Sequence, residues 1–126
     1  MNLEDFVIVK SLLNAQTLAN TLARTGIPTR MHGGLIRYIC EGIQPGDFLM
    51  AVLQNDLKEA FVRADYQNRE LIHEYLSFLH NAAPAVCHGS VAKVTEWLRL
   101  GAESLNRPDQ ILMKNRRNDP TGEGRF

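Results

Sequence analysis

The sequence has no excess of charge of either sign, because 14 lysines and arginines balance 14 aspartates and glutamates over 126 residues. This balance argues against a protein dedicated to coating nucleic acid, although it leaves room for a local basic patch. Hydrophobic residues make up 44% of the chain and charged residues 22%, as in ordinary globular proteins. A chain of this length is expected to form one domain with its own core.

Cysteine is scarce, and no apolar run is long. The only two cysteines, Cys40 and Cys87, give no disulfide framework and are interpreted as reduced thiols of a cytoplasmic protein. The N-terminus carries acidic residues before its first apolar run and has no basic segment, so it does not resemble a secretory signal. No apolar run approaches the roughly 20 residues of a membrane span. We therefore expect a cytoplasmic protein without a membrane partner.

Signatures of catalysis and of metal binding are also missing. The sequence contains no G-x-S-x-G, no phosphate-cradling glycine loop and no H-E-x-x-H. No C-x-x-C pair supports a zinc site. Cys87 beside His88 leaves cysteine–histidine catalysis as a minor alternative, since adjacent residues rarely form the working pair. We predict no catalytic residue, no metal, no cofactor and a protein that is not an enzyme.

Helical spacing of apolar residues, interrupted by clusters of turn-forming residues, is what the sequence does have. The segments predicted to be helical are 5–24, 31–41, 48–63, 65–80 and 91–105. They predict an all-α fold, a compact bundle of about five helices in a single domain over residues 1–105. Residues 106–126 have no apolar period and are expected to form a short extension and a mobile, disordered C-terminal tail.

Alanine recurs every four residues in the first predicted helix, at Ala15, Ala19 and Ala23. This spacing leaves a shallow groove that another helix can approach closely. We interpret the groove as a contact inside the core, with a homodimer seam as the alternative.

Asp56 is the polar residue that fits its predicted helix least well. In the segment 48–63 it falls within an apolar arc, and Arg63 lies two turns later on nearly the same line. An isolated buried carboxylate is costly, so it must be paired or hydrogen-bonded. We favour a structural clamp, in which Asp56 caps a neighbouring segment or pairs with a cation such as Arg63. The alternative is the floor of a binding site, with Asp56 as acceptor and Arg63 as donor.

Further polar groups gather near Asp56 in the sequence. Asn68 is a second polar residue on an apolar arc, in the segment that starts at Asp65. Together with Asn55 and Arg63, these residues concentrate hydrogen-bonding groups around one corner. Such a corner most often holds a helix–helix turn together, and it can also bind a small polar ligand or a partner.

A longer pattern carries a family resemblance. The run "MHGGLIRYICEGIQPGDFLMAVLQNDLKEAFVRAD", followed by "FLHNAAPAVCHGS" and "VTEWL", resembles a group of small phage and prophage accessory proteins. The resemblance covers about residues 31–98. It implies a phage context and carries no chemistry with it.

This resemblance, with the absence of catalytic motifs, favours a non-enzymatic accessory protein that binds a host factor in the host cytoplasm. A counter-defence inhibitor of a host protein or complex would use the groups near Asn55 and Asp65. One alternative is a sponge for a signalling nucleotide, bound by Arg37, Tyr38 and Arg63 in a pocket shared between subunits.

Another alternative is a nucleic-acid-associated regulator that uses the C-terminal tail. Basic residues slightly outnumber acidic ones there. The basic residues are Arg107, Lys114, Arg116, Arg117 and Arg125, and the acidic residues are Asp109, Asp119 and Glu123.

Overall fold

A computed structural model describes residues 1–106, which form eight α-helices and one 3-10 turn and contain no strand. The elements are α1 (Leu3–Ser11), α2 (Ala15–Leu22), α3 (Thr29–Glu41), α4 (Asp47–Leu53), α5 (Leu57–Arg63), α6 (Tyr66–Arg69), α7 (Ile72–Ala82), η1 (Ala85–Cys87) and α8 (Val91–Asn106). The all-α prediction is confirmed. The number of helices is wrong, because three of the five predicted helices are interrupted. The predicted tail lies outside the described residues.

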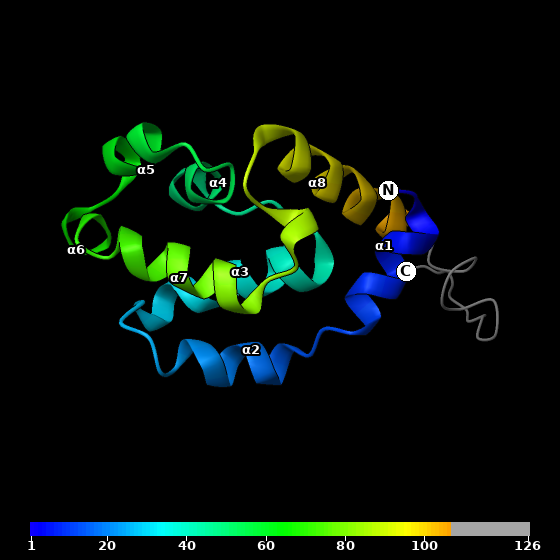
Figure 1. The fold of residues 1–126 in the computed structure, drawn as a ribbon, viewed down its shortest axis with the longest axis horizontal. Coiled ribbons are helices and arrows are strands. Elements are labelled where there is room, and N and C mark those ends of the chain that lie inside the picture. Colours follow the sequence, from blue (N-terminus) through cyan, green and yellow to red (C-terminus); the bar gives the residue numbers. More distant parts are fainter. Residues whose placement is uncertain (107–126) are drawn as a thin grey trace.

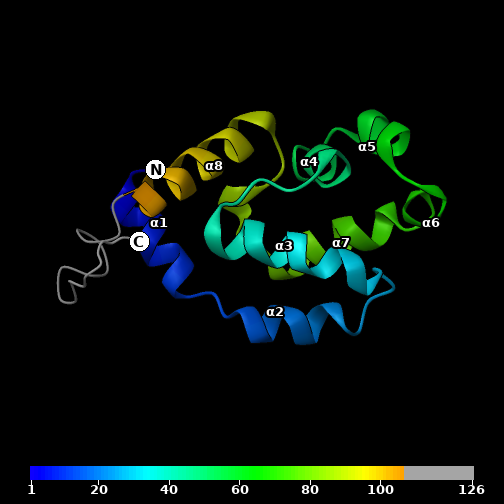
Figure 2. The same ribbon diagram turned by 180° about the vertical axis from the view of Figure 1, so that it is seen from behind.

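The helices are arranged along one long axis (Figure 1). The short helices α5 and α6 lie at one end, and α1 lies with the C-terminal end of α8 at the other. Between them, α7 lies in front of α3 in Figure 1 and behind it in Figure 2. Helix α2 packs against α3 and α7 along one side, while α4 and α8 lie on the opposite side.

The first interruption lies between α1 and α2. The Asn14 side chain accepts a hydrogen bond from the Thr17 amide at 3.0 Å and caps α2, a position that asparagine favours. The break resets the helical phase, so that Ala15 and Ala23 are exposed. The prediction that these residues face the core is therefore wrong, because it assumed one uninterrupted helix. The homodimer seam stays a prediction.

The second interruption separates α4 from α5. Asn55 adopts a left-handed φ of 63°, which asparagine tolerates better than most residues. The Asp56 amide donates to the Ala51 carbonyl at 2.9 Å and the Asn55 amide to the Val52 carbonyl at 3.0 Å. These two bonds form a Schellman motif that ends α4. The single helix predicted over 48–63 is therefore wrong.

The third interruption separates α6 from α7 at Glu70 and Leu71. No glycine, proline or left-handed residue marks it. A tertiary contact spans the break instead, since the Tyr75 hydroxyl donates to Oδ1 of the buried Asn68 at 2.5 Å.

One part of the core joins α3 to α8 and η1, and we call it the α3–α8 junction. Buried hydrogen bonds run from the Tyr38 hydroxyl to the Cys87 carbonyl at 2.6 Å and from Trp97 Nε1 to the Tyr38 carbonyl at 2.9 Å. Gly42 ends α3 with a φ of 70° against Gly101 of α8. A Cβ on Gly101 would lie 2.6 Å from the Gly42 carbonyl oxygen, so this approach requires glycine.

Candidate functional site

Asp56 is exposed and lies between α4 and α5, so it is not on the inner side of a helix. Its Oδ1 accepts a hydrogen bond from the Glu59 amide at 3.1 Å and thereby caps α5. Arg63 pairs elsewhere, with Glu59 at 2.6 Å and Asp47 at 3.5 Å. Asp56 thus has a structural role, but the proposed pairing with Arg63 does not occur.

Asp65 and Asn68 are held within the chain as well. The Asp65 carboxyl accepts a hydrogen bond from the Asn68 amide at 2.8 Å and forms an ion pair with Arg30 at 2.7 Å. The hydrogen bond first, and then the Arg30 guanidinium, hold the pKa of Asp65 below its ordinary value. The Asn68 side chain accepts from Tyr75 in the core. These polar groups stabilise helix starts and turns in the described conformation.

Arg37 and Tyr38 point in different directions from α3. Arg37 is exposed and its guanidinium lies over Gly33, whereas Tyr38 is completely buried. Consecutive helical residues lie on different faces, which explains the separation. In this conformation the Tyr38 ring has no free face on which a base could stack. The nucleotide sponge remains a prediction, and the basic tail of the nucleic-acid alternative lies outside the described residues.

Four large apolar side chains lie exposed on α5 and α6, next to the predicted polar corner. The exposed fractions are 52% for Leu57, 51% for Phe61, 60% for Val62 and 88% for Tyr66. We call these four residues the α5–α6 surface. Both helices lie at one end of the molecule (Figure 1). An uninterrupted helix over 48–63 would turn Leu57 toward the core, so this surface was not predicted from the sequence. The Asn55–Asp56 pair was the signal that could have revealed the change of phase.

Arg69 lies beside the α5–α6 surface and is incompletely satisfied. Its guanidinium carbon lies 4.4 Å from the centroid of the Phe61 ring, in cation–π geometry. Its Nε atom is buried and has no hydrogen-bond partner within residues 1–106. A buried donor without an acceptor is costly.

Cys87 is poorly placed for nucleophilic chemistry. The residue is buried, and burial raises the pKa of its thiol to about 12. Reactive cysteines instead have a lowered thiol pKa and some exposure. Within residues 1–106, no group of three or more histidine, cysteine, aspartate or glutamate residues is placed to hold a metal ion.

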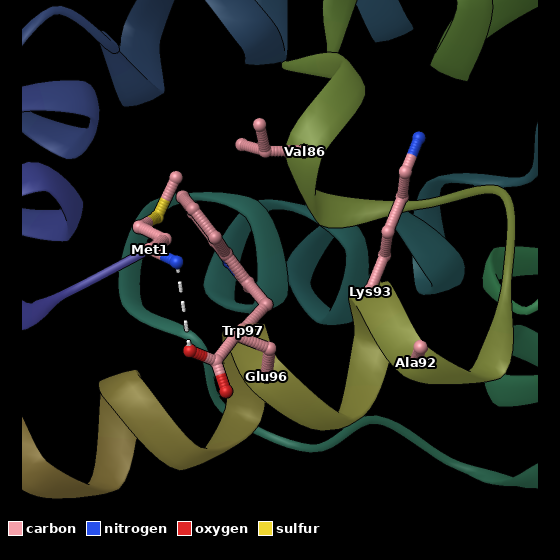
Figure 3. A pocket seen from close by; sticks show the side chains of 6 residues that line it. All are labelled: Met1, Val86, Ala92, Lys93, Glu96 and Trp97. Carbon is pink, nitrogen blue, oxygen red and sulfur yellow. Dashed lines mark ion pairs between the residues drawn. The ribbon is translucent and has the colours of Figure 1, made fainter.

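A pocket of about 260 Å³ lies at the N-terminal part of α8. Figure 3 shows the residues that line it, and we call it the α8 pocket. They are Met1, Val86, Ala92, Lys93, Glu96 and Trp97. The Trp97 ring forms one wall, and the Lys93 side chain extends along another.

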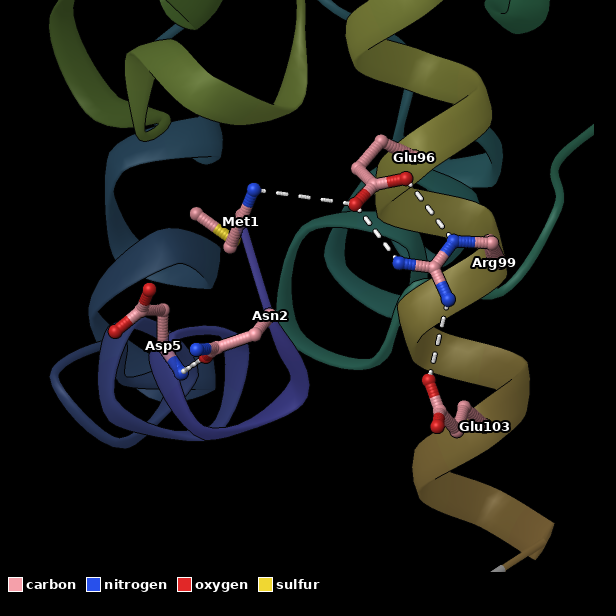
Figure 4. Close-up of polar contacts among 6 residues, drawn as sticks. All are labelled: Met1, Asn2, Asp5, Glu96, Arg99 and Glu103. Carbon is pink, nitrogen blue, oxygen red and sulfur yellow. Dashed lines mark hydrogen bonds and ion pairs between the residues drawn. The ribbon is translucent and has the colours of Figure 1, made fainter.

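The carboxylate of the α8 pocket already has partners. Glu96 accepts hydrogen bonds from Arg99 at 2.8 and 3.0 Å, and the backbone nitrogen of Met1 lies 4.0 Å from it (Figure 4). The bond from Arg99 is the main cause that lowers the pKa of Glu96. Lys93, in contrast, has no carboxylate within ion-pair distance among the described residues.

Comparison with known proteins adds no relative: no protein-family model, no curated protein and no solved structure matches this chain. Across residues 1–106, no helix is long and apolar enough to cross a membrane.

Proposed function

We propose that this chain is a non-enzymatic binding protein that attaches to a host protein through the α5–α6 surface. The observation that carries the proposal is the exposure of Leu57, Phe61, Val62 and Tyr66 on two consecutive short helices. Single exposed apolar residues are ordinary, but grouped ones commonly mark contact sites. The resemblance to phage accessory proteins supports a host factor as the partner and counter-defence as the setting.

The residue types in this region suit protein recognition. Tyrosine and arginine are enriched among the residues that contribute most to binding energy. Tyr66 has the most exposed side chain of the surface, and Arg69 is held against Phe61. A partner that covers Phe61 and Tyr66 would bury apolar area beside the Arg69 guanidinium.

The local structure also reduces the cost of binding. Asp56 and Asp65 cap α5 and α6, and Arg63 joins α5 to Asp47 of α4. These bonds hold both short helices in place before a partner arrives. A pre-organised surface loses less conformational freedom on association.

The proposal is tested with a paired comparison of variants. Wild-type protein and the double variant Phe61→Ser/Tyr66→Ser are used to capture proteins from a bacterial host lysate. A captured protein is then purified, and its dissociation constant is measured for each variant. The matched control is Ile8→Ser/Leu12→Ser, which removes two exposed apolar side chains at the opposite end of the molecule.

We expect the double variant to weaken binding by about 1,000-fold, since two interface residues of this type are worth roughly 2 kcal/mol each. The control variant should bind within about twofold of wild type. A purified partner that binds the Phe61→Ser/Tyr66→Ser variant as tightly as wild type would refute the assignment of this surface.

A further inference from the structure

We propose that the α8 pocket binds a small organic anion with an apolar body, such as a medium-chain aliphatic carboxylate. This site is separate from the α5–α6 surface: its lining comes from α8, η1 and the first residue, whereas α5 and α6 lie at the far end of the molecule. The proposal therefore does not depend on the proposed protein partner.

The size of the pocket limits the apolar body of the ligand. A cavity of roughly 150 Å³ holds a single benzene ring, and drug-sized ligands occupy pockets of roughly 300–1,000 Å³. At about 260 Å³, the α8 pocket lies between these two cases. Val86, Ala92 and the Trp97 ring supply apolar walls. The ligand expected from this size is a chain of several carbons or one substituted ring.

The charges at the rim favour an anion. Glu96 is held by Arg99, and its charge is compensated there. The Lys93 ammonium lacks a carboxylate partner within residues 1–106 and lies near Gly89, in the loop that follows η1. His88, in the same loop, has a pKa lowered first by burial and then by Lys93. Lys93 is thus the cation at the pocket whose charge has no partner, and the carboxylate of a ligand would neutralise it.

The wall formed by the Trp97 ring is held in place before any ligand binds. Trp97 Nε1 donates to the Tyr38 carbonyl at 2.9 Å, and Phe6 meets the Trp97 ring edge-on with the ring centroids 4.6 Å apart. These contacts hold the indole ring in one orientation. A wall that is already ordered loses little conformational freedom when a ligand binds.

Trp97 also provides the measurement, because it is the single tryptophan of the chain. Its fluorescence is recorded while octanoate, octylamine or 1-octanol is added to the full-length protein at constant ionic strength. We expect a saturable change with octanoate and weaker binding of the other two compounds. Octanoate that gives no saturable change, or that binds no better than octylamine, overturns the proposal.

Two variants locate the site. Ala92→Phe fills the pocket and should abolish the octanoate response, while Thr95→Phe places the same ring on an exposed part of α8 outside the lining and should preserve it. Lys93→Gln should weaken octanoate binding about two- to fivefold, the worth of an exposed ion pair. Lys58→Gln, on α5, is the matched control and should change nothing.

Thermal unfolding of each variant confirms that it is folded. The amide NMR signals of Val86 and Ala92 give a second readout, because they should shift when octanoate binds. An unchanged octanoate affinity in Ala92→Phe overturns the location of the site. An unchanged affinity in Lys93→Gln overturns the ligand class.

Discussion

The α3–α8 junction and the corner formed by the short helices α4, α5 and α6 are stabilised in opposite ways. At the junction, residues distant in sequence approach closely, as Gly42 does with Gly101 and Tyr38 with Cys87. At the corner, most bonds connect residues a few positions apart, such as the cap from Asp56 to Glu59.

This difference explains where apolar side chains remain exposed. The junction buries Tyr38 and Trp97 because two long helices meet there. Helices α5 and α6 have seven and four residues, and each buries a single residue, Ala60 in α5 and Asn68 in α6. Short helices are marginal without tertiary support, so caps stabilise them. The corner thus combines locally stabilised backbone with apolar side chains that are free for a partner.

The largest effect is expected from Gly101→Ala at the junction. The new Cβ would lie 2.6 Å from the Gly42 carbonyl oxygen, which is backbone and cannot rotate away. Overpacking of this kind costs about 3 kcal/mol of unfolding free energy, measurable by urea denaturation. The control is Gly46→Ala, because no atom lies within 4 Å of its Cβ position. A Gly101→Ala variant as stable as the control would show that α3 and α8 can separate without cost.

Tyr75→Phe should have the next largest effect, because it links the corner to the core. It leaves the buried Asn68 oxygen without its donor, at a cost of about 2 kcal/mol. Tyr66→Phe removes the same hydroxyl from an 88% exposed ring and should stay within about 0.5 kcal/mol of wild type. Equal stabilities of the two variants in urea denaturation would mean that the Asn68–Tyr75 contact does not support α6.

Asp56→Ala should cost about 1 kcal/mol, the usual contribution of an N-cap. Asp56→Asn should be nearly neutral, since asparagine caps helices about as well as aspartate does. Thermal unfolding of both variants tests the cap assignment. If the two substitutions destabilise the protein equally, the charge of Asp56, rather than its capping oxygen, is what matters.

The contrast between these regions also shows what the sequence could predict. The boundaries of α3 and α8 followed from local signals, because Gly42 ends one helix and Ser90 precedes the other. The caps at Asn14 and Asp56 are equally local signals. The apolar period continues across both of them, however, and therefore predicts uninterrupted helices. The break at Glu70 and Leu71 has no local signal, so no reading of propensity could place it.

The residues of the candidate site also divide into those with a local sequence signal and those without one. The polar residues at the corner were identified, and Asp56 and Asp65 are indeed structural caps. The apolar residues beside them were missed, because the exposure of Leu57 depends on the phase after the break. Tyr38, which the sequence suggested as a nucleotide-binding residue, is instead completely buried.

The smallest effect concerns the acid sensitivity of the corner. The pKa of Asp65 lies below its ordinary value, chiefly through the hydrogen bond from the Asn68 amide and then through Arg30. A lowered pKa in the folded state means that ionised Asp65 stabilises the protein above the unfolded-state pKa. That contribution is lost as the pH falls through the folded-state value.

The melting temperature of wild type should therefore fall more between pH 5 and pH 2 than that of Asp65→Asn. The asparagine can still cap α6, but it has no charge to lose and no ion pair with Arg30. The difference should be small because the pair is exposed and screened by salt, and it should shrink further in 0.5 M NaCl. Parallel acid profiles for the two proteins would mean that the corner depends on its hydrogen-bonded caps alone, whereas diverging profiles would show that charge also holds α6 against α3.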